Sequence, residues 1–188
     1  VYVGLAVTSG VADTLASATF SKVKATTMPW TWASADVGTV VISGSTTYRP
    51  STDTYTLVGA GKDIGGTEDG FRMMYQHVGG DCSMVTRVAS QTATSPWALA
   101  GIMMRENVSG VPGSGARNVT VAVTPSNGVQ FTARSSTGGT TSSLGSVGGA
   151  APRWLKLTRV GTAFSAYASY DGISWQSIGT TTMGMQSS

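Results

Sequence analysis

The sequence contains few charged residues, one cysteine and one histidine. Only 11% of the 188 residues are charged, and the 12 basic and 9 acidic side chains are spread singly along the chain. Proteins that bind nucleic acid usually cluster their positive charge, so this distribution argues against a nucleic-acid partner. A single cysteine, Cys82, excludes an internal disulfide framework, and its apolar neighbours favour a buried thiol over a reactive one.

The residues that catalysis requires are also scarce. His77 is the only histidine, and no surrounding pattern indicates a triad or a metal site. No pair of carboxylates stands in a motif for glycoside hydrolysis. Asp63, Glu68 and Asp69 stand among glycines, as in some calcium loops, but their spacing matches no ligand scheme, which favours ordinary turn acids. The sequence therefore predicts a non-enzymatic protein without a cofactor, and leaves calcium binding open.

Long apolar runs are absent as well. No stretch could span a bilayer, and the first residues lack the charged and apolar regions of a secretory signal. The signal peptide of a secreted form would therefore lie outside this sequence. The chain is instead rich in glycine, serine and threonine, a composition that resembles extracellular β-repeat proteins. We expect an extracellular or cell-surface location in a bacterium, without membrane insertion.

Apolar residues alternate with polar ones over many short segments. Examples are Thr54–Ala60, Trp154–Val160 and Ala163–Tyr170, and turn-forming pairs such as Asn127-Gly128 separate successive segments. No segment shows a sustained helical period. Antiparallel strands with one apolar face pack best as two facing sheets. The sequence therefore predicts an all-β fold, a two-sheet antiparallel β-sandwich of the jelly-roll type.

The first 24 residues have the pattern of a closing hairpin, although nothing precedes them to close. Two runs, Val1–Thr8 and Ala16–Val23, alternate like strands, and the residues between them include turn formers. An isolated hairpin is marginal in water, so this one must pack on a sheet. The predicted division of the chain is a hairpin over residues 1–24, a linker over 25–35, and a sandwich over 36–188 that lacks its last hairpin.

Several segments together resemble a known domain family. They are DVGTVVISGS, GAGKDIGGTEDGFRMMYQ, GDCSMVTRVAS, WALAGIMMRE, ARNVTVAVTPSNGVQFTAR, APRWLKLTRVGTAFSAYASYDGISWQSIG, and VYVGLAVTSG with ATFSKV. They are similar to the concanavalin-like, laminin-G-like jelly-roll domain of bacterial secreted proteins, a largely uncharacterised family labelled "regulation of enolase". In that family the YVGLAVTS segment comes last, whereas here it comes first. The resemblance implies a sandwich used as an accessory module, often in tandem copies, and implies no catalytic residues.

This order leaves three ways to complete the sandwich. The first segment can fold back on its own chain, insert into a neighbouring copy, or join copies within a longer tandem protein. We favour contact with another copy, because the two tryptophans of the linker suit an inter-domain geometry. The predicted function is then a structural repeat or subunit of a surface fibre, sheath or adhesin, assembled head to tail. The predicted assembly residues are Val1, Val3, Leu5, Val7, Phe20, Trp30 and Trp32.

The alternative is a carbohydrate-binding accessory module of a secreted protein, with polysaccharide as its partner. Sugars stack on aromatic rings, and arginine side chains donate hydrogen bonds to their oxygens. The candidate glycan-binding residues are Tyr75, Trp97, Arg105 and Arg117. Trp154 and Trp175 stand within strand patterns, which favours packing in the core. Trp97 follows a Ser-Pro pair and is the strongest candidate for an exposed ring.

Overall fold

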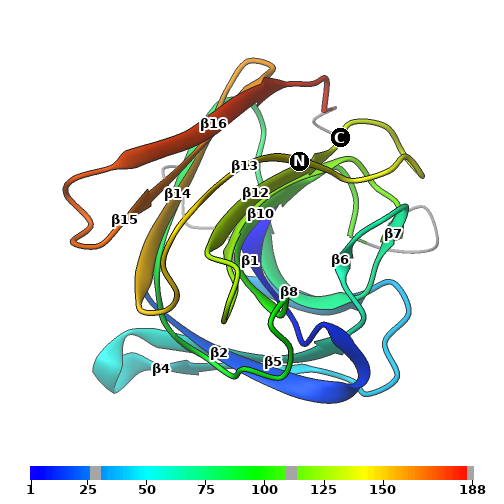
Figure 1. The fold of residues 1–188 in the computed structure, drawn as a ribbon, viewed down its shortest axis with the longest axis vertical. Coiled ribbons are helices and arrows are strands. Elements are labelled where there is room, and N and C mark those ends of the chain that lie inside the picture. Colours follow the sequence, from blue (N-terminus) through cyan, green and yellow to red (C-terminus); the bar gives the residue numbers. More distant parts are fainter. Residues whose placement is uncertain (26–30, 109–113, 186–188) are drawn as a thin grey trace.

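A computed structural model gives the fold and describes residues 1–25, 31–108 and 114–185. It confirms an all-β chain in which two antiparallel seven-stranded sheets face each other (Figure 1). A third, two-stranded sheet joins β6 (Ile64–Gly65) to β7 (Glu68–Asp69), and a short 3-10 turn, η1, covers Pro50–Thr52. No helix of the described residues is long and apolar enough to cross a membrane.

Sheet A places the first strand of the chain between two strands from its middle. Its order is β13, β12, β11, β10, β1, β8 and β3. These strands are β13 (Ser142–Val147), β12 (Val129–Arg134), β11 (Asn118–Val123), β10 (Leu99–Arg105), β1 (Tyr2–Thr8), β8 (Phe71–His77) and β3 (Ala33–Val37).

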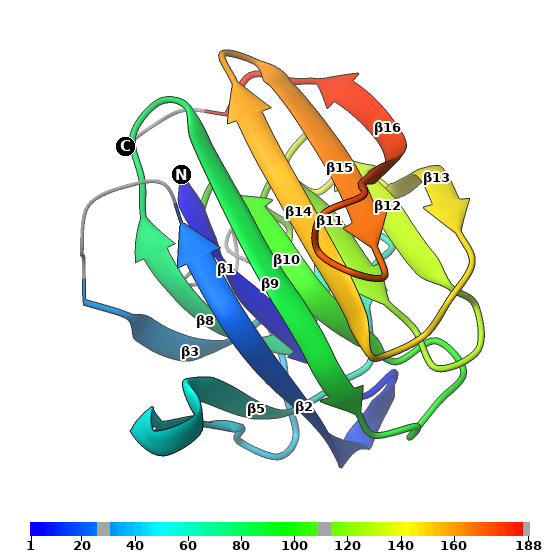
Figure 2. The same ribbon diagram turned by 90° about the vertical axis from the view of Figure 1, so that its left-hand side faces the viewer.

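Sheet B faces sheet A across the main core. Its order is β16, β15, β14, β9, β2, β5 and β4. These strands are β16 (Gln176–Thr182), β15 (Ala163–Ser169), β14 (Arg153–Val160), β9 (Cys82–Gln91), β2 (Val11–Ala25), β5 (Thr54–Gly61) and β4 (Ser45–Arg49). Figure 2 shows β2, β9, β14 and β15 side by side on the face that points away from sheet A.

The main core follows from the alternation of side chains along the strands. In β12, Val129 and Phe131 face sheet B and are fully buried, while Gln130 between them faces the other way. The thiol of Cys82 lies in this core, as predicted, and burial raises its pKa. Sheet A also carries a smaller apolar cluster on its outer face, the face turned away from sheet B, around Phe71, Met73 and Met103.

The first segment of the chain is not a hairpin. β1 pairs with β10 and β8 in sheet A, whereas β2 pairs with β9 and β5 in sheet B. The turn formers between them turn the chain from one sheet into the other. Gly10 has a φ of +69° there, and the Thr8 and Ser9 hydroxyls both donate to the Gly61 carbonyl. The segment therefore supplies one central strand to each sheet, in place of an edge pair.

Both strands lie in the sheets of their own chain. The predicted assembly residues Val1, Val3, Leu5, Val7 and Phe20 are at most 1% exposed there. The structure thus has the first of the three arrangements, closure within one chain, and differs from the predicted packing on another copy. A segment exchanged between two chains would make the same contacts, so the oligomeric state distinguishes the two arrangements.

The predicted linker is shorter than expected. Its last residues, from Ala33, begin strand β3, which pairs with β8 at the edge of sheet A. Trp32 is half-buried, packs against the main core and lies 6.1 Å from the Tyr55 ring. Trp32 therefore contacts the core of its own chain. Trp30 lies outside the described residues.

We expect the protein to be a monomer in dilute solution. The inward-facing apolar side chains of β1 and β2, among them Val3, Leu5 and Phe20, already fill the core of their own chain and are not available to a second copy. Light scattering after size-exclusion chromatography, over a series of concentrations, measures the mass. A dimer or a series of larger oligomers would instead indicate that β1 and β2 are exchanged between chains, and would support the predicted head-to-tail assembly.

Candidate ligand groove on the outer face of sheet A

The outer face of sheet A is partly covered by the loop that contains β6 and β7. Figure 1 shows sheet A between sheet B and this pair. Ile64 of the loop packs on the small apolar cluster with Phe71 and Met103. Two glycines of sheet A stand where the neighbouring strand leaves no room for a side chain. A Cβ on Gly4 would lie 2.0 Å from the Met74 carbonyl oxygen, and one on Gly101 would lie 2.1 Å from that of Val121.

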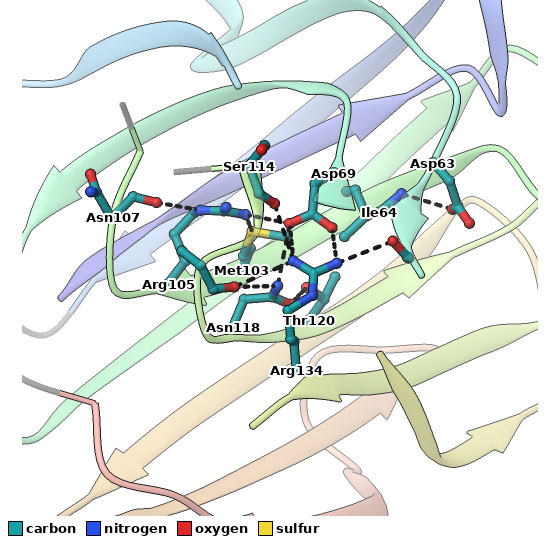
Figure 3. A network of polar contacts seen from close by, with 12 residues as sticks. Asp63, Ile64, Asp69, Met103, Arg105, Asn107, Ser114, Asn118, Thr120 and Arg134 are labelled. Carbon is teal, nitrogen blue, oxygen red and sulfur yellow. Dashed lines mark hydrogen bonds and ion pairs between the residues drawn. The ribbon is translucent and has the colours of Figure 1, made fainter. Parts of the chain in front are cut away.

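A buried cluster of charges fixes the loop to the sheet. The Asp69 carboxylate binds Arg134 through both oxygens, at 2.7 and 2.8 Å, and accepts a bond of 3.0 Å from Arg105. All three side chains are fully buried (Figure 3). Asn118 donates its amide to the same carboxylate at 3.4 Å. Two strands of the sheet, β10 and β12, are thus joined to one acid of the loop.

The remaining donors of the two arginines bind backbone carbonyls. Arg134 donates to the carbonyls of Gly65 and Gly66 in the loop, and to that of Gly139. Arg105 donates to the Asn107 carbonyl at 2.6 Å and packs against the Phe71 ring. Burial lowers the pKa of Arg105, and the neighbouring Asp69 opposes that shift. Because its polar groups are used internally, we assign this cluster a structural role.

A groove of about 370 Å³ runs beside this cluster, between the β6–β7 loop and strands β12 and β13. Its volume is at the lower end of the range for small-ligand sites. Its lining combines a large ring, two apolar side chains, one carboxylate, one amide and several hydroxyls. The lining residues are Asp63, Ile64, Gly65, Gly66, Trp97, Leu99, Gln130, Thr132, Thr141, Ser142 and Ser143.

Trp97 is the large exposed ring of the groove. It is 56% exposed although it borders the buried strand β10. Its backbone N–H donates to the Ser95 hydroxyl, and the Asn127 amide donates to the Pro96 carbonyl at 2.8 Å. Gln130 in turn donates to the Asn127 carbonyl. The backbone segment that carries the ring is therefore held by the β11–β12 turn.

Asp63 supplies the only carboxylate among the residues that line the groove. Its Oδ1 accepts the Ile64 backbone N–H at 2.7 Å. Desolvation raises the pKa of Asp63, and the bond from Ile64 works against that shift. No lysine or arginine lines the groove. Its chemistry therefore suits a neutral ligand that offers hydroxyl donors and an apolar face.

The four predicted glycan-binding residues do not form one site. Trp97 lies in the groove, but Arg105 is buried beneath the loop. Tyr75 is half-buried and lies edge-on against Tyr2, with the ring centres 5.4 Å apart. Arg117 contacts Glu106 at 3.8 Å and donates to the Gly184 carbonyl. The interpretation of Arg105 as a sugar donor is wrong, because its side chain is fully buried against Asp69, a partner that no local pattern around Arg105 indicates.

Trp154 and Trp175 were expected in the core, and this too was wrong. Trp154 faces away from the main core, since it pairs in register with Arg87 and alternates with the buried Leu155. Trp175 lies against Lys156 on the same outer face of sheet B, with the ammonium 4.6 Å from its ring centre. The strand pattern is the same for either face. Only the burial of the alternate residues identifies the inner one.

Sequence reasoning missed the polar half of the groove. Gln130 and Thr132 alternate with the buried Phe131, so their outward direction could have been inferred from the pattern. Their proximity to Asp63 could not, because 67 positions separate Asp63 from Gln130 and no local pattern links them. Within the described part of the chain, no three His, Cys, Asp or Glu side chains gather where they could hold a metal ion.

Comparisons with known proteins leave the groove without a precedent. No protein-family model, no curated protein and no solved structure matches the chain. The resemblance to the concanavalin-like domain stays a prediction from the sequence segments, and the groove has to be interpreted from its own residues.

Proposed function

We propose that the protein is a carbohydrate-binding module of an extracellular or cell-surface protein, and that it holds a neutral glycan in the groove beside Trp97. The observation that supports this most directly is an exposed ring in a groove that hydroxyls, an amide and a carboxylate also line. Sugars have the same two-sided character, since their C–H faces pack on aromatic rings and their hydroxyls exchange hydrogen bonds. A polar groove without cations suits such a ligand.

The proposal is for binding without hydrolysis. Glycoside hydrolysis ordinarily requires two carboxylates placed on either side of the bond that is cut. Asp63 is the one acid in the groove lining, and the buried Asp69 is neutralised by two arginines. A fibre subunit would be the competing function. Its main argument was an incomplete sandwich, which the strands β1 and β2 complete within one chain.

The Trp97→Ala variant is expected to lose glycan binding. Removal of a central aromatic contact typically costs about 2 kcal/mol or more, so the affinity should fall at least about tenfold. A glycan array identifies the best neutral ligand, and calorimetry then compares the variant with the unaltered protein. Tyr48→Ala is the matched control, since Tyr48 is 48% exposed on the other sheet. An array without any bound neutral glycan, or equal affinity of both variants, would contradict the proposal.

A further inference from the structure

The outer face of sheet B, which points away from sheet A, carries positive charge in regular rows. The register aligns Arg49, Thr54, Ser21, Arg87 and Trp154 on five neighbouring strands, from β4 to β14. Directly paired residues of antiparallel strands lie on the same face, so these five side chains form one row across the sheet. With strands about 4.8 Å apart, this row is about 19 Å long.

A second row runs beside the first. It aligns Lys24, Val85, Lys156, Tyr167 and Ser177 from β2 to β16. Together the two rows form a band of cations, hydroxyls and rings, which we call the basic band. Figure 2 shows most of its strands facing the viewer.

The basic band has no acid of its own. Asp13 is the only acidic residue in the described strands of sheet B, and it lies where β2 shifts its register, outside both rows. Arg49, Arg87 and Lys156 form no salt bridge with any acid of the described residues. Asp171, in the turn near Trp154, is occupied by the Ser169 hydroxyl and two backbone N–H groups. The positive charge of the band is thus available to a ligand.

The rings of the band favour a sugar over a nucleic-acid base. The Lys156 ammonium lies 4.4 Å from the centre of the Tyr167 ring and 4.6 Å from that of Trp175. It lies over one face of each ring, so an unpaired base could not stack on that face. The same ammonium, held between two rings, is well placed for a carboxylate or sulfate. Hydroxyls of Thr54, Ser21 and Ser177 in the two rows can bind the neighbouring sugar oxygens.

We propose that the basic band binds an acidic polysaccharide, a linear chain of uronate or sulfated sugars that crosses the strands of sheet B. This site is separate from the groove beside Trp97, on the opposite side of the molecule, and its charge selects a different class of glycan. The module would then hold a neutral and an acidic glycan on its two faces.

The test compares polygalacturonate with the same polymer after full methyl esterification, which removes the charge and keeps the backbone. The unaltered protein should bind polygalacturonate, lose that binding as salt is added, and bind the ester at least about tenfold more weakly. Arg87→Gln and Lys156→Gln should each reduce the affinity about fivefold, the value for one lost charge contact. Lys62→Gln, an exposed cation outside sheet B, is the matched control and should change it less than twofold.

Three results would overturn the proposal. They are equal binding of the acid and the ester, equal effects of Lys156→Gln and Lys62→Gln, and tighter binding of a single-stranded DNA of similar length that depends on the same residues. Trp97→Ala separates the two proposed sites, because it should leave the affinity for polygalacturonate unchanged. Failure of the groove proposal would therefore leave this result unaffected.

Discussion

Replacement of Asp69 by asparagine is expected to lower the free energy of unfolding by about 3–5 kcal/mol, the cost of removing one partner from a buried ion pair. Asparagine has nearly the same shape, so the loss comes from the charge. Arg105 and Arg134 would remain fully buried with no carboxylate between them, and would repel each other. Urea denaturation, followed by tryptophan fluorescence, measures the change.

Asp36→Asn is the matched control for this variant. Asp36 also pairs with an arginine, Arg72, but the contact is 3.4 Å long and both side chains are partly exposed. Its loss should cost about 1 kcal/mol, less than the loss of Asp69, because solvent reaches this pair and weakens its attraction. If Asp69→Asn proved no more harmful than Asp36→Asn, the charge cluster would not be a main support of the fold.

The same cluster connects stability to the proposed function. Arg134 binds the carbonyls of Gly65 and Gly66, and both glycines line the groove. An unsupported loop would also displace Asp63, which stands two residues before Gly65. One wall of the groove is thus a loop that buried charges hold against the sheet. Asp69, Arg105 and Arg134 thus hold in place a groove wall that the sheet alone does not supply.

The sequence predicted the strands well because alternation is a local property. The pattern of β12, for example, follows directly from Val129, Phe131 and their polar neighbours. Strand partners are a different matter, because pairing depends on contacts far apart in the chain. The turn formers between Val1–Thr8 and Ala16–Val23 predict a hairpin, yet Gly10 lies at a corner between two sheets. Turn residues indicate a change of direction, and they do not indicate which sheet the next strand enters.

For the candidate site, too, the sequence indicates local features but not the contacts between distant residues. Trp97 could be identified because it is a large ring directly after the Ser95-Pro96 pair, at the very start of the apolar run 97–106. Arg105 could not be distinguished from an exposed donor, since its partners Asp69 and Asn107 lie in loops on either side. A buried ion pair produces no periodic pattern in the sequence. Its recognition needs the three-dimensional structure.

A variant without residues 1–25 is expected not to fold. The deletion removes β1 and β2, the strands that join the two parts of each sheet. Val3, Leu5 and Phe20 alone would each forfeit about 1.5–3 kcal/mol of burial, against a total stability of about 5–15 kcal/mol for a domain. Circular dichroism and thermal unfolding should show no cooperative transition. If the truncated protein folded, the two sheets would be stable without β1 and β2.

The decisive control moves the same residues to the other end of the chain. Val1 and Met185 belong to one core cluster, and Arg159 donates to the Met185 carbonyl at 3.0 Å. A permuted chain that begins at residue 31 and runs through 188 into 1–30 should therefore fold, with a stability within about 2 kcal/mol of the original order. This order is also the one that the resembled family would have. If the permuted chain failed to fold, the order of the segments would itself be required for folding, and the family order would be excluded for this protein.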